Sequence, residues 1–323
     1  MLPRRTALAS LGALVAAPAL RAQSAAWSPN RPLRLNVTYP PGGVNDIVGR
    51  IVAEPLGRAL GQPVIVENRA GAGGNIGTQA AAQSEADGQT ILFGTTAMFG
   101  VNPILYANTG VDAVRDFTCL GTIGEVANVL SAVPARVKAG SVAEFIAEAK
   151  ARPLIYGSVG NGSSSHLSAV VFLRSCGIDA THVPYRGSSP LVAAMLAREV
   201  DSGFDTAATS TAQIRAGAFR PLAVTTTRRA SALPEVPTMQ EAGVPGYDLG
   251  IWFGLFVPRK TPPAIIRHLT AALERTRTPQ TEQRLQSAFV DPLYIPQPEV
   301  DGYIRASALR WQGIAKDARI SVD

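Results

Sequence analysis

The chain has 323 residues, of which 46% are hydrophobic and 17% charged, which is enough for two ordinary domains with packed cores. This composition excludes a disordered, collagen-like or disulfide-rich protein. The formal net charge is +6, but the basic residues are scattered and form no patch with base-stacking side chains, so we expect no nucleic-acid partner.

The first 26 residues have the pattern of an export signal. Arg4 and Arg5 precede an uncharged apolar stretch over residues 6–20, and small residues follow at 22–26. The apolar stretch is too short to span a bilayer comfortably, so we expect cleavage rather than an uncleaved anchor. The arginine pair leaves open whether export uses the general secretory (Sec) or the twin-arginine route.

Strands and helices are expected to alternate from residue 33 onward. Alternating apolar and polar residues predict a strand over 33–39, and apolar residues at helical spacing predict a helix over 45–60, which Pro55 should kink or end. Next we expect a strand at 64–67, a glycine-rich turn at 68–77 that opens a second helix, and a strand at 90–95. This order is typical of a mainly parallel sheet covered by helices.

The second half repeats this pattern. Capping boxes at 141–144 and 238–241 predict helix starts, and Ser189 should cap a helix with Pro190 at its first position. Gly177 should end a helix over 165–176. Further expected strands are 154–158, 181–184, 200–204, 221–225 and 251–257, and further expected helices are 262–277 and 298–317. No linker or repeat marks a domain boundary.

The side chains offer little for metal, cofactor or disulfide chemistry. Cys119 and Cys176 are expected to be buried free thiols rather than a bridge. The chain has three histidines, and no Cys or His pair has ligand spacing, so we expect no metal site. The glycine turn at 71–77 lacks both the Gly-x-Gly-x-x-Gly spacing and the later acidic residue of a dinucleotide site, so we expect no cofactor.

A serine run beside a histidine raises the alternative of a serine hydrolase. The nucleophile elbow of such enzymes needs a glycine two residues after the serine. None of Ser163, Ser164 and Ser165 has one, and no orienting acid is arranged beside His166. Nucleophilic catalysis is therefore the weaker interpretation.

Two glycine-bearing loops, at 39–46 and 157–166, each follow a predicted strand and precede a predicted helix. Such loops present free backbone N–H groups, and the helix dipole adds partial positive charge, so the two loops could hold one anion from two sides. Asp46 could cap N–H groups or hold a water, and Asp205 could receive an ammonium or hydroxyl group. The expected ligand-binding residues are Tyr39, Pro41, Gly42, Gly43, Asp46, Thr95, Thr96, Gly160, Asn161, Gly162, Ser163, Ser164, His166, Tyr185, Gly187 and Asp205.

Short motifs spread over the chain point to one family. They are YPPGG at 39–43 with Asp46, VENRAGAGG at 66–74, DG at 87–88, NP at 102–103, VPYRG at 183–187, LPEVPT at 233–238 and EAGVPGY at 241–247. In this order the set resembles the Bug family, the extracytoplasmic solute-binding receptors of tripartite tricarboxylate transporters. The resemblance runs from about residue 32 to the C-terminus.

The resemblance implies an α/β periplasmic-binding-protein fold, type II-like, with two α/β domains and a central ligand cleft. Domain 1 would combine 30–128 with 250–323, and domain 2 would be 129–249. A ligand carboxylate would lie between the 41–46 and 160–164 loops. The family would make this chain a monomeric periplasmic receptor, not an enzyme, which captures a small carboxylate by cleft closure and delivers it to membrane permease subunits. A sensory receptor for a membrane kinase remains the alternative.

Overall fold

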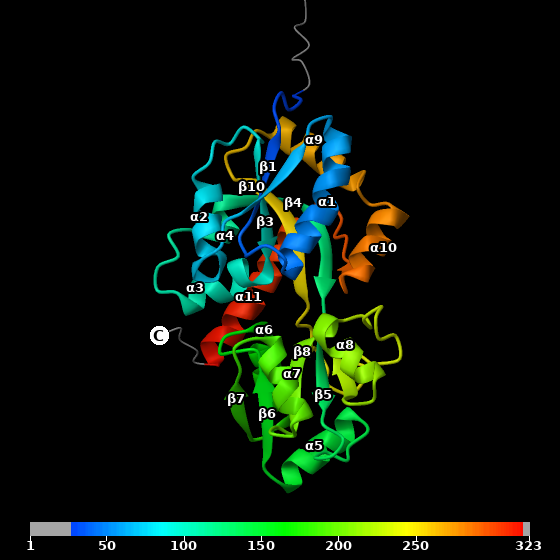
Figure 1. Cartoon of the computed structure of the whole chain (residues 1–323). Coiled ribbons are helices and arrows are strands. Elements are labelled where there is room, and N and C mark those ends of the chain that lie inside the picture. Colours follow the sequence, from blue (N-terminus) through cyan, green and yellow to red (C-terminus); the bar gives the residue numbers. More distant parts are fainter. Residues whose placement is uncertain (1–26, 319–323) are drawn as a thin grey trace, which may run out of the picture.

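The computed structural model describes residues 27–318, so the expected export signal at 1–26 lies outside the described residues. Two separate β-sheets, each with its own helices, form the upper and lower halves of the molecule in Figure 1. We call these halves the upper lobe and the lower lobe. The chain passes from the upper to the lower lobe after strand β4 and returns with strand β10.

The upper lobe contains a six-stranded sheet in the order β11-β4-β10-β3-β1-β2. β1 pairs in parallel with β2 and β3, whereas β10 lies antiparallel between β3 and β4. The strands are β1 (Leu33–Val37), β2 (Val64–Asn68), β3 (Thr90–Thr95), β4 (Phe117–Val126), β10 (Ile251–Pro258) and β11 (Asp291–Pro292).

The upper lobe's helices cover both faces of its sheet. They are α1 (Val44–Leu60), α2 (Asn75–Ala82), α3 (Asn102–Leu105), α4 (Ala113–Asp116), α9 (Pro263–Glu274), α10 (Pro279–Ser287) and α11 (Val300–Asp317), with short turns of helix η1 (Ala72–Gly74) and η2 (Ala97–Val101). The expectation that Pro55 ends the regular part of α1 is wrong, because α1 continues to Leu60. One lost hydrogen bond is offset by an apolar face, including Val52 and Leu56, that packs into the sheet core.

The lower lobe contains a five-stranded sheet in the order β7-β6-β8-β5-β9. Its elements are β5 (Asn128–Ala132), α5 (Val142–Ala151), β6 (Leu154–Ser158), α6 (Ser164–Cys176), β7 (Ala180–Pro184), α7 (Ser188–Leu196), β8 (Ser202–Thr206), α8 (Ala207–Arg215) and β9 (Arg220–Val224). β6 is parallel to β7 and β8, but β5 is antiparallel to both of its neighbours. Both sheets are therefore mixed rather than mainly parallel, because β10 in the upper lobe and β5 in the lower lobe run antiparallel to both of their neighbours.

Two predicted helix starts need correction. Gly187, not Ser189, is the N-cap of α7. At the second capping box the reciprocal hydrogen bonds do form: the Thr238 N–H donates to Glu241 Oε2 at 2.8 Å, and the Glu241 N–H donates to Thr238 Oγ1 at 3.1 Å. Turns follow instead of a helix, because Gly243 takes a φ of +92° and Pro245 comes two residues later. The predicted cap at Ser141 and the stop at Gly177 are confirmed.

The last helix joins the two lobes. α11 runs from the upper lobe down to α6 of the lower lobe (Figure 1). Its Trp311 is 2% exposed and belongs to the hydrophobic cluster of the lower lobe, together with Phe145 and Phe172. The lobes thus share a continuous apolar contact on one side of the molecule.

Both cysteines are free thiols, as predicted; Cys119 is buried and Cys176 is half-buried. Over residues 27–318, no helix combines the length and the apolar character needed to cross a membrane. Within the same residues, no group of three or more His, Cys, Asp or Glu side chains is arranged to hold a metal ion.

Candidate functional site

A cavity of about 360 Å³ lies where the two lobes meet. Its lining includes the start of α1 (Val44 and Asn45) and the end of β3 with the residues after it (95–97) from the upper lobe. The lower lobe supplies the 161–164 segment and Thr206 at the end of β8. The cavity therefore lies at strand carboxyl ends and at two helix starts, which is where open α/β sheets place ligands.

The loop before α1 presents main-chain donors to this cavity. Gly42 takes a φ of +85°, which favours glycine, and Gly43 is the N-cap of α1. The N–H of Gly43, Val44 and Asn45 pair with no acceptor among the described residues, whereas the Gly42 N–H donates to Asp46 Oδ2 at 3.0 Å. The carbonyl oxygen of the half-buried Asn45 side chain is also without a partner in residues 27–318. The start of α1 thus offers unpaired donors and partial positive charge.

Asp46 stabilises this loop through hydrogen bonds. Its carboxylate accepts hydrogen bonds from Arg50 Nε at 3.0 Å and Asn68 Nδ2 at 3.0 Å, in addition to the Gly42 N–H. The Arg50 guanidinium, assisted by the Gly42 and Asn68 donors, lowers the pKa of Asp46 to about 2. Asp46 is 4% exposed and does not line the cavity. Its place in the structure matches the capping role rather than a direct ligand contact.

We expect Asp46→Asn to lower the free energy of unfolding by about 1–2 kcal/mol at pH 7, with Arg50, half in solvent, limiting the loss. The folded-state pKa lies below the ordinary value of about 4, so the carboxylate's stabilisation is full above that pH and fades as the pH falls toward 2. Urea unfolding at pH 7 and pH 3 measures the difference. A gap between wild type and variant that widens at pH 3 would contradict this account.

The loop before α6 is similarly arranged. Gly160 and Gly162 take φ values of +130° and +73°, and their N–H groups donate to Ser158 Oγ at 3.2 Å and His166 Nδ1 at 3.2 Å. Ser163 Oγ caps α6 by accepting the His166 N–H at 3.2 Å. In the described part of the chain, no acceptor pairs with the N–H of Asn161 or Ser164. These two residues line the cavity, so α6 also brings unpaired donors to it.

A stack of three rings supports this second loop. The rings of His182 and His166 lie 4.0 Å apart and within 5° of parallel, and Tyr156 stacks on the other side of His182 at 4.8 Å. His182 Nε2 shares a hydrogen bond of 2.7 Å with Ser158 Oγ. Burial lowers the pKa of His166 to about 4, with a smaller contribution from His182, whose own pKa burial also lowers. The neutral rings therefore hold the loop through Gly162 and Ser158.

The structure brings part of the predicted site to the cavity. The predicted residues that line it are Tyr39, Thr95, Thr96, Asn161, Gly162, Ser163 and Ser164. The predicted residues that do not line it are Pro41, Gly42, Gly43, Asp46, Gly160, His166, Tyr185, Gly187 and Asp205. Asp205 is buried; its Oδ1 accepts from Ser188 Oγ at 2.8 Å and from the Thr206 N–H at 2.7 Å, and its Oδ2 has no partner in the described residues.

Sequence reasoning missed the apolar part of the lining. It consists of Val44, Ala97, Val101, Leu105, Tyr106, Val126, Ile251, Phe253 and Trp311. In the sequence these residues are indistinguishable from core residues, so no local signal identifies them. Sequence reasoning also missed the supporting role of His182, although it predicted the strand over 181–184 on which this residue lies.

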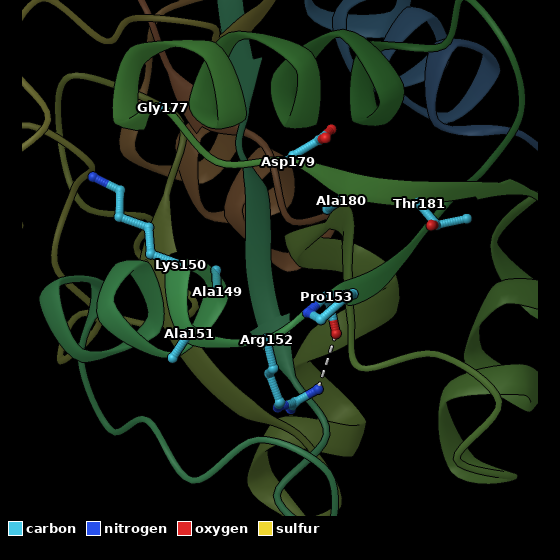
Figure 2. A pocket seen from close by; sticks show the side chains of 9 residues that line it. All are labelled: Ala149, Lys150, Ala151, Arg152, Pro153, Gly177, Asp179, Ala180 and Thr181. Atoms are coloured by element: carbon cyan, nitrogen blue, oxygen red, sulfur yellow. Dashed lines mark hydrogen bonds between the residues drawn. The ribbon is translucent and has the colours of Figure 1, made fainter.

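A second cavity, of about 480 Å³, lies in the lower lobe at the opposite end of the sheet (Figure 2). It is bordered by the end of α5, by the residues just before β6 and by the start of β7, whereas the loop before α6 follows the other end of β6. Arg152 in its wall pairs with Glu148 at 2.7 Å and Asp201 at 3.3 Å. The Arg152 guanidinium is thus engaged in ion pairs within the lower lobe.

Comparison with known proteins decides the family. A model described as the tripartite tricarboxylate transporter family receptor, TctC, matches residues 48–320. The chain belongs to this family. The resemblance to the Bug receptors and the expected periplasmic-binding-protein fold are thereby confirmed. The members of this family are substrate-binding receptors, so this TctC receptor is not an enzyme and the hydrolase alternative is wrong.

Named relatives span almost the whole chain of this TctC receptor. Protein BugT of Bordetella pertussis is 33% identical over 318 residues, covering 96% of each chain. A structure from R. palustris with adipate is 34% identical, with a TM-score of 0.75 over 91% of this chain and 99% of that one. MatC from Rhodopseudomonas palustris with bound malate is 28% identical, with a TM-score of 0.69 over 89% and 99% of the two chains.

Proposed function

We propose that this TctC receptor works in the periplasm, where it captures a small carboxylate between its lobes and delivers it to the permease subunits of a tripartite tricarboxylate-type transporter. The observation that carries the proposal is the meeting of two helix starts on one cavity. Unpaired N–H groups of Val44 and Asn45 come from the upper lobe, and those of Asn161 and Ser164 come from the lower lobe. Adipate and malate bound to two relatives support a carboxylate ligand.

Uncharged hydrogen-bond donors are sufficient to bind a carboxylate. Hydrogen bonds from main-chain N–H groups to a carboxylate are charge-assisted and roughly twice as strong as neutral ones. Each helix start adds the equivalent of about half a positive charge. A carboxylate placed between the two loops would satisfy donors that otherwise have no protein partner, which favours a closed cleft when the ligand is bound.

Closure requires a hinge between the lobes. β4 ends at Val126 and β5 begins at Asn128, and the chain returns through the segment between β9 and β10. We propose the limits 30–128 plus 250–323 for one domain and 129–249 for the other, with bending at these crossings. The shape of the closed form would then be what the membrane subunits recognise.

Calorimetry on the purified mature chain tests the ligand class. We expect small carboxylates to bind and to raise the melting temperature, and the corresponding neutral amides to bind much more weakly, because an amide lacks the charge that the helix starts stabilise. Binding of amides as tight as that of the acids would overturn the proposal.

The membrane partner and the cleavage of the export signal need separate experiments. Co-purification of the loaded receptor with permease subunits supports delivery, whereas co-purification with a membrane kinase alone would favour the sensory alternative. N-terminal sequencing of protein recovered from the periplasm should show loss of about the first 26 residues, the expected signal.

A further inference from the structure

The lining of the interlobe cavity is informative about the part of the ligand beyond its carboxylate. None of the lining side chains within residues 27–318 is Arg, Lys, His, Asp or Glu. The lining away from the two loops is mainly apolar and aromatic: Val101, Leu105, Tyr106, Ile251, Phe253 and Trp311. At about 360 Å³ the cavity is also at the small end of the range for ligand pockets.

Some of the polar side chains in the rest of the lining are already engaged. Asn102 Nδ2 donates to the Gly73 carbonyl at 3.0 Å and to Asn75 Oδ1 at 2.9 Å. The Thr206 hydroxyl shares a hydrogen bond of 3.1 Å with that of Thr209. A second carboxylate that took hydrogen bonds from these groups would break such pairs, and each broken pair leaves a buried group unsatisfied.

The charge balance of the site also favours a ligand with one carboxylate over a ligand with two. The two helix starts together supply the equivalent of about one positive charge, which matches one carboxylate. A second carboxylate in the same cavity would meet no cationic side chain in the described lining. A charge buried without a partner is costly, whereas a hydrocarbon group gains free energy by leaving water for this lining.

We propose that the site takes an apolar monocarboxylate, in which a single carboxylate is attached to a short hydrocarbon chain or an aromatic ring. The inference rests on the proposed function, since it assumes that the two loops hold the carboxylate. Tyr106, Phe253 and Trp311 offer ring faces and edges against which such a group packs.

Calorimetry with matched acids tests this proposal. Hexanoate is compared with adipate, and benzoate with terephthalate, because each pair differs by one carboxylate on the same skeleton. We expect each monocarboxylate to bind about 10- to 100-fold more tightly than its dicarboxylate partner. Hexanamide and benzamide serve as uncharged controls.

The outcomes separate the two ideas. If adipate and terephthalate bind as tightly as hexanoate and benzoate, or more tightly, the monocarboxylate inference is overturned while carboxylate capture stands. If neither hexanoate nor benzoate binds, the monocarboxylate inference is again overturned while carboxylate capture stands. If the amides bind as tightly as the acids, the proposed function falls and the inference falls with it.

A cation introduced into the lining provides a second test. Ile251 is half-buried on β10, so Ile251→Arg can keep its stem on the apolar surface and place its guanidinium in the cavity. We expect the ratio of adipate to hexanoate affinity to rise about tenfold in Ile251→Arg and to stay unchanged in Ile251→Met. Leu105→Arg replaces it if the first variant does not fold. An unchanged ratio in a folded arginine variant would contradict the inference.

Discussion

Proline in place of Val44 is expected to weaken carboxylate binding about 10- to 100-fold without disturbing the fold. Val44 is the first residue of α1, and its N–H has no acceptor among the described residues. Proline is well tolerated at a first helical position, and the preceding Gly43 has the extended conformation that proline requires, with a ψ of 169°. The substitution therefore removes one donor that we propose faces the ligand, and it also changes the Val44 side chain, which lines the cavity and packs against the core.

The matched control is Val44→Ala, which shortens the side chain but keeps the N–H and should retain most of the affinity for a short acid such as acetate. Ser164→Pro makes the same change in the lower lobe, since Ser164 begins α6 after a residue with a ψ of 158°. Calorimetry measures the affinities, and circular dichroism checks the fold. Unchanged affinity in both proline variants would show that main-chain groups of these helices do not hold the ligand.

Acidification from pH 6.5 to pH 4 is expected to cost about 3 kcal/mol of stability through His166 alone. The folded protein holds this ring neutral, with a pKa of about 4, whereas an unfolded histidine titrates near 6.5. The unfolded state therefore binds the proton first, and stability is lost as the pH falls through this interval. His182, whose pKa is also lowered, adds to the loss.

Two substitutions separate charge from hydrogen bonding at this position. His166→Asn keeps an acceptor for the Gly162 N–H but does not titrate, so it should remove most of the acid sensitivity. His166→Leu also removes the titration but leaves that N–H unpaired, so it should cost about 1–3 kcal/mol at pH 7. Urea unfolding between pH 4 and pH 7 provides both numbers. An Asn variant with the full acid sensitivity of the wild type would contradict this role of His166.

The sequence predicted those elements that are marked by the periodicity or the capping residues of their own segment. The strands that became β1, β3, β6 and β10 were predicted from their hydrophobic periodicity or apolar runs, and both glycine loops were placed before the helices that they open. Ser141 and Gly177 act through their immediate neighbours, so their capping roles could be recognised without knowledge of the fold.

What the sequence did not predict depends on contacts between distant segments. β4 and β5 cover residues 117–132 with only Ala127 between them, and irregularly spaced polar residues such as Glu125 and Asn128 leave no clean alternation from which periodicity could place either strand. Helix α1 tolerates Pro55 because of its packing in the tertiary structure, and the capping box at Thr238 fails to start a helix because of the glycine and proline that follow. The apolar cavity lining comes from six separate elements, α1, η2, α3, β4, β10 and α11, so no local pattern could identify it as a site.

The position of β10 has a consequence for the order of folding. It lies in the middle of the upper sheet, between β3 and β4, yet it follows the whole lower lobe in the chain. During synthesis the lower lobe, which is encoded without interruption from β5 to β9, can assemble first as a local unit. β3 must wait with one unpaired edge and β4 with two until residue 258 is available, so these edges are where premature association with another chain is most expected.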